Sequence, residues 1–173
     1  MTLLERVAGF LFSRDIPHAL IGAAALAVHG VSRSTLDQDL LVVDRNVLDA
    51  SFWTGVSGAA VEVRRGDEAD PLAGVVRIRA EGERDVDVVV GRSAWQEAVL
   101  GRATRLGAGP LFVVDVADLI LLKLYAGGSQ DRWDIEQLLA LDLGAAAALA
   151  VEQRIAPLPE RSRQMWTALR AGH

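Results

Sequence analysis

Two aspartates, Asp37 and Asp39, stand one residue apart at the start of an apolar run, DQDLLVV. Successive residues of a β-strand point to opposite faces of the sheet, so the two carboxylates share a face. Carboxylate oxygens are the ligands that Mg²⁺ and Mn²⁺ prefer, whereas zinc prefers nitrogen and sulfur. The pair therefore indicates a divalent-cation site, or else an ordinary strand end whose acids face water.

A third carboxylate is available further along the chain, in the run RDVDVVV. Asp85 and Asp87 share a face of that strand, and either one could join the pair if the two strands are neighbours. Two carboxylates about 4 Å apart repel by about 4 kcal/mol at an effective dielectric constant near 20. Three acids gathered at neutral pH need a bound cation or a raised pKa. A metal site here would have Asp85 or Asp87 as its third member; the alternative is that these are ordinary strand-end and hairpin acids that face water.

A turn and a loop beside the acid pair could bind phosphate. Gly22 joins a short apolar run to an Ala-rich segment that begins with Ala23. A strand, a glycine turn and a helix start present free backbone N–H groups to an anion. Arg33, in the loop before Asp37, could neutralise a phosphate or pair with one of the acids. The alternatives are a common packing turn and a surface arginine.

Lys123 is the one lysine among 18 basic residues, and it lies in the apolar run LILLKLY. A lysine within an apolar helix is costly unless its ammonium finds an anion, such as a triphosphate or the acid cluster. The alternative is a lysine whose ammonium extends to the helix surface. Asp131 and Asp134 share one face of the next helix. Capping and the helix dipole explain Asp131, and a functional role for the two acids is the alternative.

Periodicity and capping signals predict the elements that position these residues. We expect strands over residues 18–21, 39–43, 59–65, 75–79, 84–90 and 110–114, with 75–79 and 84–90 forming an antiparallel hairpin. We expect helices over residues 2–14, 23–29, 45–53, 94–102, 116–126, 131–141, 145–155 and 160–170. The helix at 23–29 is apolar on all sides, so it should be buried.

This order predicts an α+β fold, a mixed sheet with helices on it, over residues 1–114. A small C-terminal helical bundle, residues 115–173, should pack on that core as one structural unit. The net charge of −5 excludes a generally basic nucleic-acid coat. The absence of cysteine excludes disulfides and thiolate chemistry and fits a reducing compartment, so we expect a cytoplasmic protein. No apolar run approaches the ~20 residues of a membrane span.

Two stretches resemble a known family. These are ALIGAAALAVHGVSRSTLDQDLLV and VADLILLKLYAGGSQDRWDIEQLL. Together they resemble the nucleotidyltransferase superfamily, which has the polymerase-beta-like fold, and within it the minimal nucleotidyltransferases of the AbiEii toxin type. The resemblance implies that Asp37, Asp39 and Asp87 bind the metal and are catalytic, with Asp87 helping to deprotonate the acceptor hydroxyl.

The resemblance also assigns nucleotide contacts. Gly22 and Ala23 would form the nucleotide-binding turn, and Lys123 would touch the phosphates. Arg33 and Thr35 match the loop that precedes the acids. Ala23 departs from the family, which has glycine or serine there, so we expect weaker or altered nucleotide binding.

The activity implied is the transfer of NMP from an NTP to a hydroxyl, with Mg²⁺ (or Mn²⁺) as cofactor. The acceptor would be an RNA, such as tRNA, or a protein. The setting would be a toxin–antitoxin or phage-defence pair with a cognate partner protein and no membrane contact. The alternative is a catalytically degenerate module of the same fold that binds a nucleotide or a partner.

Overall fold

A computed structural model describes residues 1–34 and 37–172. Thr35, expected to contact the nucleotide, lies outside the described residues. The chain divides into two compact units, each described separately below. The first contains residues 1–25 and 33–114, and the second contains residues 26–32 and 115–173. That the C-terminal part packs on the core as one structural unit stays a prediction.

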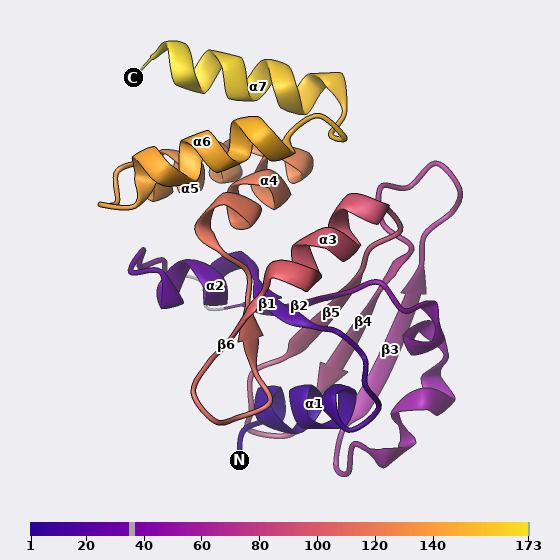
Figure 1. The fold of residues 1–173 in the computed structure, drawn as a ribbon. Coiled ribbons are helices and arrows are strands. Elements are labelled where there is room, and N and C mark those ends of the chain that lie inside the picture. The colour runs from indigo at the N-terminus through magenta and orange to yellow at the C-terminus, as the bar shows by residue number, and fades with distance from the viewer. Residues whose placement is uncertain (35–36, 173) are drawn as a thin grey trace. The chain divides into compact units, whose positions relative to one another are not determined.

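In the described part of the first unit, seven strands form one mixed sheet in the order β3-β4-β5-β2-β1-β7-β6 (Figure 1). The strands are β1 (Ala19–Ile21), β2 (Gln38–Val42), β3 (Ala60–Arg65), β4 (Gly74–Arg79), β5 (Val86–Val90), β6 (Thr104–Arg105) and β7 (Phe112–Val113). Strands β2 and β5 are parallel, whereas β4 and β5 form the expected antiparallel hairpin. The predicted fold class, a mixed sheet with helices, is confirmed.

Helices flank the sheet and make up most of the second unit. Those that begin in the first unit are α1 (Leu3–Phe12), α2 (Gly22–Val28), η1 (Arg45–Leu48), η2 (Ala50–Gly55) and α3 (Ala94–Arg102). The second unit holds α4 (Val116–Ala126), α5 (Ser129–Leu139), α6 (Gly144–Arg154) and α7 (Glu160–Ala171). Within that unit α4 is central, because it packs against α5, α6 and α7.

Alternation along the strands gives β4 and β5 one buried and one polar face. Val76, Ile78 and Val88 are fully buried, while the residues between them, such as Arg77 and Asp87, are partly exposed. Helix α1 packs against β5, and α3 packs against β2. The period of two thus leaves the acids and arginines of β4 and β5 on the polar face, where they can meet solutes.

Local capping fixes several helix starts where the sequence predicts them. Thr2 and Glu5 form a capping box at the start of α1. The Asp115 side chain accepts a hydrogen bond from the backbone N–H of Asp118 at 2.7 Å, so α4 begins at Val116. Helix α4 ends at Ala126 and is capped by Gly127, which has φ +75°.

Two expectations about elements are corrected, and one strand has no counterpart among the predicted elements. The helix predicted over residues 45–53 is instead two 3₁₀ helices, because the side chain of Asp49 accepts from the Ser51 N–H and starts a second one. The helix at 23–29 is not buried throughout, since Val28 is 45% exposed. Strand β6 was not predicted, because two residues carry no periodic signal.

Every helix in residues 1–34 and 37–172 is too short or too polar to traverse a lipid bilayer.

Candidate active site

Strand register brings two of the predicted acids together. In the parallel pair β2–β5, Asp39 is the direct partner of Asp87. Neighbouring strands lie about 4.8 Å apart, so both side chains rise from adjacent points on one face. Asp85 stands two residues earlier, before β5 begins, where its carboxylate pairs with Arg79. The register therefore places Asp87, and not Asp85, beside Asp39.

The carboxylate of Asp39 approaches Gly22 closely. The φ of Gly22 is +60°, in the left-handed region that favours glycine. A Cβ at this position would lie 3.2 Å from Asp39 Cγ and closer still to Oδ2. The carboxylate of Asp39 thus occupies the space that a side chain at position 22 would need. This steric conflict explains a glycine at position 22 whether or not the turn binds a phosphate.

Asp37, directly before β2, lies at the same pocket as Asp39 and Asp87. A pocket of about 250 Å³, here called the acid pocket, is lined by Asp37, Gln38, Asp39, Arg77, Asp85 and Asp87. All of these residues belong to the first unit. The structure therefore brings the three predicted acids to one pocket and adds an arginine that the sequence analysis did not assign.

Arg77 holds Asp87 in a two-pronged ion pair. Its Nε donates to Oδ1 at 2.7 Å, and its Nη2 donates to Oδ2 at 2.6 Å. The two residues are direct cross-strand partners on β4 and β5. The hydrogen bond to Asp87, and secondarily the charge of Asp87, raise the pKa of the Arg77 guanidinium above its ordinary value. Arg77 is therefore a permanent positive charge at the acid pocket.

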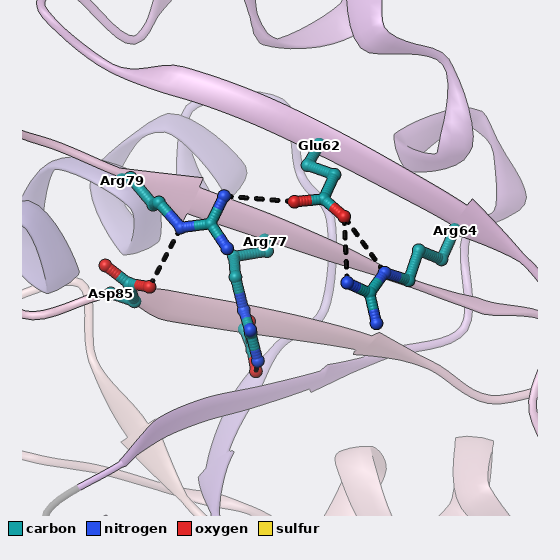
Figure 2. Close-up of polar contacts among 6 residues, drawn as sticks. Glu62, Arg64, Arg77, Arg79 and Asp85 are labelled. Atoms are coloured by element: carbon teal, nitrogen blue, oxygen red, sulfur yellow. Dashed lines mark hydrogen bonds and ion pairs between the residues drawn. The ribbon is translucent and has the colours of Figure 1, made fainter.

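A second set of ion pairs covers the neighbouring part of the same polar face. Figure 2 shows Arg79 between Glu62 and Asp85, with Nη1–Oε2 and Nε–Oδ2 distances of 3.0 and 3.1 Å. Glu62 also pairs with Arg64 at 2.9 Å. Both partners lower the pKa of the Glu62 carboxyl, the Arg79 hydrogen bond most. Glu62, the other cross-strand neighbour of Arg77, is thus engaged by two other arginines.

The residues of the acid pocket fit a divalent cation only in part. Asp37 and Asp39 offer oxygen ligands of the kind that Mg²⁺ and Mn²⁺ prefer. Both oxygens of Asp87, however, accept hydrogen bonds from Arg77. In the described residues, no group of three or more His, Cys, Asp or Glu side chains has an arrangement that could hold a metal ion. The role of all three acids as ligands stays a prediction.

Lys123 lies in the second unit, where two acids hold its ammonium. Its Nζ lies 3.0 Å from Asp131 Oδ1 and 2.7 Å from Asp134 Oδ2. The Asp134 side chain is fully buried, and the Lys123 side chain is 10% exposed. The ammonium of this lysine is therefore neutralised by acids of the next helix, α5. Its contact with a phosphate stays a prediction.

The remaining predicted nucleotide contacts lie near Gly22 and β2. Ala23 is buried at the start of α2. Arg33 precedes β2 in the chain, within the first unit. Neither position, as the structure shows it, tests the nucleotide contact that the resemblance implies.

Sequence reasoning missed two ion pairs whose signals were present. Arg77 and Asp87 are equidistant from Gly82, the middle of the predicted hairpin turn, so symmetric pairing would have placed them opposite each other. Lys123 precedes a Gly-Gly turn and an acidic helix face, which would have placed Asp131 near it. Both signals depend on pairing two elements, which neither element shows alone.

Comparison with solved structures identifies the fold. The chain is similar to the crystal structure of ANT(2'')-Ia in complex with adenylyl-2''-tobramycin, at 14% identity and a TM-score of 0.51. The alignment covers 98% of this chain and 96% of that one. An antigenic nucleotidyltransferase-like protein from Paracoccidioides brasiliensis aligns at 18% identity over 98% of this chain and 91% of that one, with a TM-score of 0.46. No family model and no curated protein matches the sequence. The chain has the nucleotidyltransferase fold.

Proposed function

We propose that this chain is a divalent-metal-dependent nucleotidyltransferase that moves NMP from an NTP to a hydroxyl and releases pyrophosphate. The observation that carries the proposal is the register of Asp39 beside Asp87, with Asp37 at the same pocket. The likeness of fold to ANT(2'')-Ia, along nearly the whole length of both chains, supports it.

Each residue has a distinct part in this reaction. Asp37 and Asp39 would hold Mg²⁺ or Mn²⁺, which supplies charge stabilisation for the triphosphate. The acceptor hydroxyl oxygen forms a bond to the α-phosphorus, while the bond between that phosphorus and the bridging oxygen breaks and pyrophosphate leaves. Asp87 would accept the hydroxyl proton. Each of its oxygens keeps a further lone pair when Arg77 is bound, so it can still accept.

The nucleotide contacts are proposed on the resemblance of the two sequence stretches. Gly22 and Ala23 would lie along the triphosphate, with Arg33, Thr35 and Lys123 as further contacts. For Lys123 this role requires its ammonium to serve a phosphate as well as, or instead of, Asp131 and Asp134. Ala23 stands where the family has glycine or serine, so no hydroxyl there can bind the phosphates, and we expect weaker or altered nucleotide binding.

The test is transfer of label from NTP carrying ³²P at the α-phosphate, with each of the four nucleotides. Acceptors should include total RNA, cell protein and an aminoglycoside, the last because ANT(2'')-Ia was solved with adenylyl-2''-tobramycin. Asp39→Asn keeps the shape of the side chain beside Gly22 and should abolish transfer. Asp142→Asn, at an exposed acid of the second unit, is the matched control and should leave transfer unchanged. Equal transfer by wild type and Asp39→Asn would refute the proposal.

The same resemblance suggests a setting and a partner. The transfer would act on RNA or protein within a toxin–antitoxin or phage-defence pair, as in the AbiEii type. Expression of the wild-type chain and of Asp39→Asn, each with and without the product of the neighbouring gene, tests this. Growth arrest, or its relief, that depends on Asp39 supports it. Growth that is identical in all four strains contradicts it.

The ion pair at the acid pocket favours a second candidate, a module that binds nucleotide without turnover. Its motivation is that Arg77 engages both oxygens of Asp87, the proposed proton acceptor. This candidate predicts calorimetric binding of Mg²⁺ and NTP without label transfer to any acceptor. Label transfer that depends on Asp39 would exclude it.

A further inference from the structure

Arg77 lies where two pockets meet. Together with Asp87 it lines the acid pocket, and the same two residues line a neighbouring pocket of about 420 Å³ at the β3–β4 end of the sheet. The Arg77 guanidinium therefore shares the acid pocket with Asp37 and Asp39. A cation that enters this pocket meets a positive charge that is already present.

The sheet fixes Arg77 in this place. Arg77 and Asp87 are direct partners in an antiparallel ladder, so backbone register sets their approach. Both prongs of the guanidinium are used, with donor–acceptor distances of 2.7 and 2.6 Å. The pair is also partly shielded, because the side chains are 39% and 21% exposed. A fork that matches a carboxylate in this way cannot be reproduced by lysine, which offers a point charge.

Besides Asp37 and Asp39, two further carboxylates neighbour Arg77, and other arginines already bind both of them. Glu62, its neighbour on β3, is bound by Arg64 and Arg79. Asp85, which also lines the acid pocket, is bound by Arg79. Release of Asp87 would therefore leave the guanidinium without a replacement among these two acids.

We propose that Arg77 is a resident cation at the third acid, which positions the Asp87 carboxylate and keeps a second divalent ion from binding there. This inference rests on the proposed function, since it concerns the same acid pocket. The site would then bind one divalent ion through Asp37 and Asp39. Arg77 would supply the positive charge at Asp87 and hold its remaining lone pairs toward the acceptor hydroxyl.

The experiment is titration of the full chain with Mn²⁺ alone, followed by calorimetry and by loss of the free-ion EPR signal. Wild type should bind one Mn²⁺. Arg77→Gln should bind a second Mn²⁺, because the Asp87 carboxylate is then no longer occupied by a guanidinium that repels a divalent ion a few ångströms away. Arg77→Lys should give a smaller gain. Arg64→Gln, on the same face but outside the acid pocket, should match wild type.

The additional Mn²⁺ binding of Arg77→Gln should depend on the Asp87 carboxylate. Adding Asp87→Asn to Arg77→Gln should return Mn²⁺ binding to that of Asp87→Asn alone. An unchanged number of bound Mn²⁺ ions in Arg77→Gln, with a cooperative thermal transition that shows a folded chain, overturns the inference. If Arg77→Gln does not fold, Arg77→Lys decides by the same criterion.

Failure here is distinguishable from failure of the proposed function. If wild type transfers label and the Arg77 variants bind Mn²⁺ as wild type does, only the proposed role of Arg77 is refuted. Two Mn²⁺ bound to wild type would do the same. The absence of both Mn²⁺ binding and label transfer in wild type removes the proposed function and this inference with it.

Discussion

Substitution of Gly22 by alanine should destabilise the first unit through two separable effects. The first is backbone conformation, because φ is +60° and a non-glycine residue pays about 1–2 kcal/mol in that region. The second is overlap, because the new Cβ would lie 3.2 Å from Asp39 Cγ and closer still to Oδ2. Forcing atoms into such a packed place costs about 1–3 kcal/mol. The sum is a loss of about 2–5 kcal/mol in the free energy of unfolding.

A double-mutant cycle separates the two effects by urea unfolding. In an Asp39→Ala background the carboxylate is gone, so Gly22→Ala should cost only the backbone share, about 1–2 kcal/mol. Gly58→Ala is the matched control, since Gly58 has φ +70° in the same unit and nothing within 4 Å of its added Cβ. Gly22→Ala should cost more than Gly58→Ala in the wild-type background and the same in the Asp39→Ala background. Equal costs in both backgrounds would refute the steric explanation of Gly22.

Three further predictions concern ion pairs and a loop. Lys123→Met should lower the free energy of unfolding by about 3–5 kcal/mol, because it removes the ammonium that pairs with the buried Asp134, and Lys123→Met/Asp134→Asn should recover part of the loss; no recovery would contradict the pairing. Arg92→Ala should cost about 1–3 kcal/mol and speed hydrogen exchange in residues 67–72, where Arg92 binds the carbonyls of Asp67, Glu68 and Leu72; unchanged exchange there would contradict that anchoring. The hydrogen bond from Arg6, with burial opposing it, lowers the pKa of Glu83 from its ordinary 4.5, so its contribution to stability is present above pH 4.5 and is lost as pH falls through the lowered pKa. Glu83→Gln should therefore flatten the decline of Tm below pH 4.5, and an unchanged slope would contradict this.

The sequence was sufficient where local signals decide the structure. Helices over residues 94–102 and 116–126 have the predicted bounds, and the second starts at the cap formed by Asp115. The antiparallel hairpin of β4 and β5 follows from two alternating runs around a short turn. These features depend on residues within a few positions of each other, so periodicity and capping chemistry are enough.

The sequence predicted which acids form the candidate site, but it did not predict which residues surround them. Spacing showed that Asp37 and Asp39 share a face, but it left Asp85 and Asp87 as alternatives until register placed Asp87 beside Asp39. The pairing of Arg77 with Asp87 depends on which residues of two strands stand opposite each other. The partners of Lys123 lie on another helix. Such contacts are tertiary, and no single element of the sequence carries them.

The most direct test of the central claim is the position of the phosphate that is transferred. The chain is incubated with Mg²⁺, an RNA or protein acceptor, and the same NTP labelled with ³²P at either the α- or the γ-phosphate. Nucleotidyl transfer predicts α-label in the acceptor and γ-label in pyrophosphate, with both signals lost in Asp39→Asn. γ-Label in the acceptor, α-label transfer that persists without Asp39, or no α-label transfer with any NTP and any acceptor in the panel would contradict it.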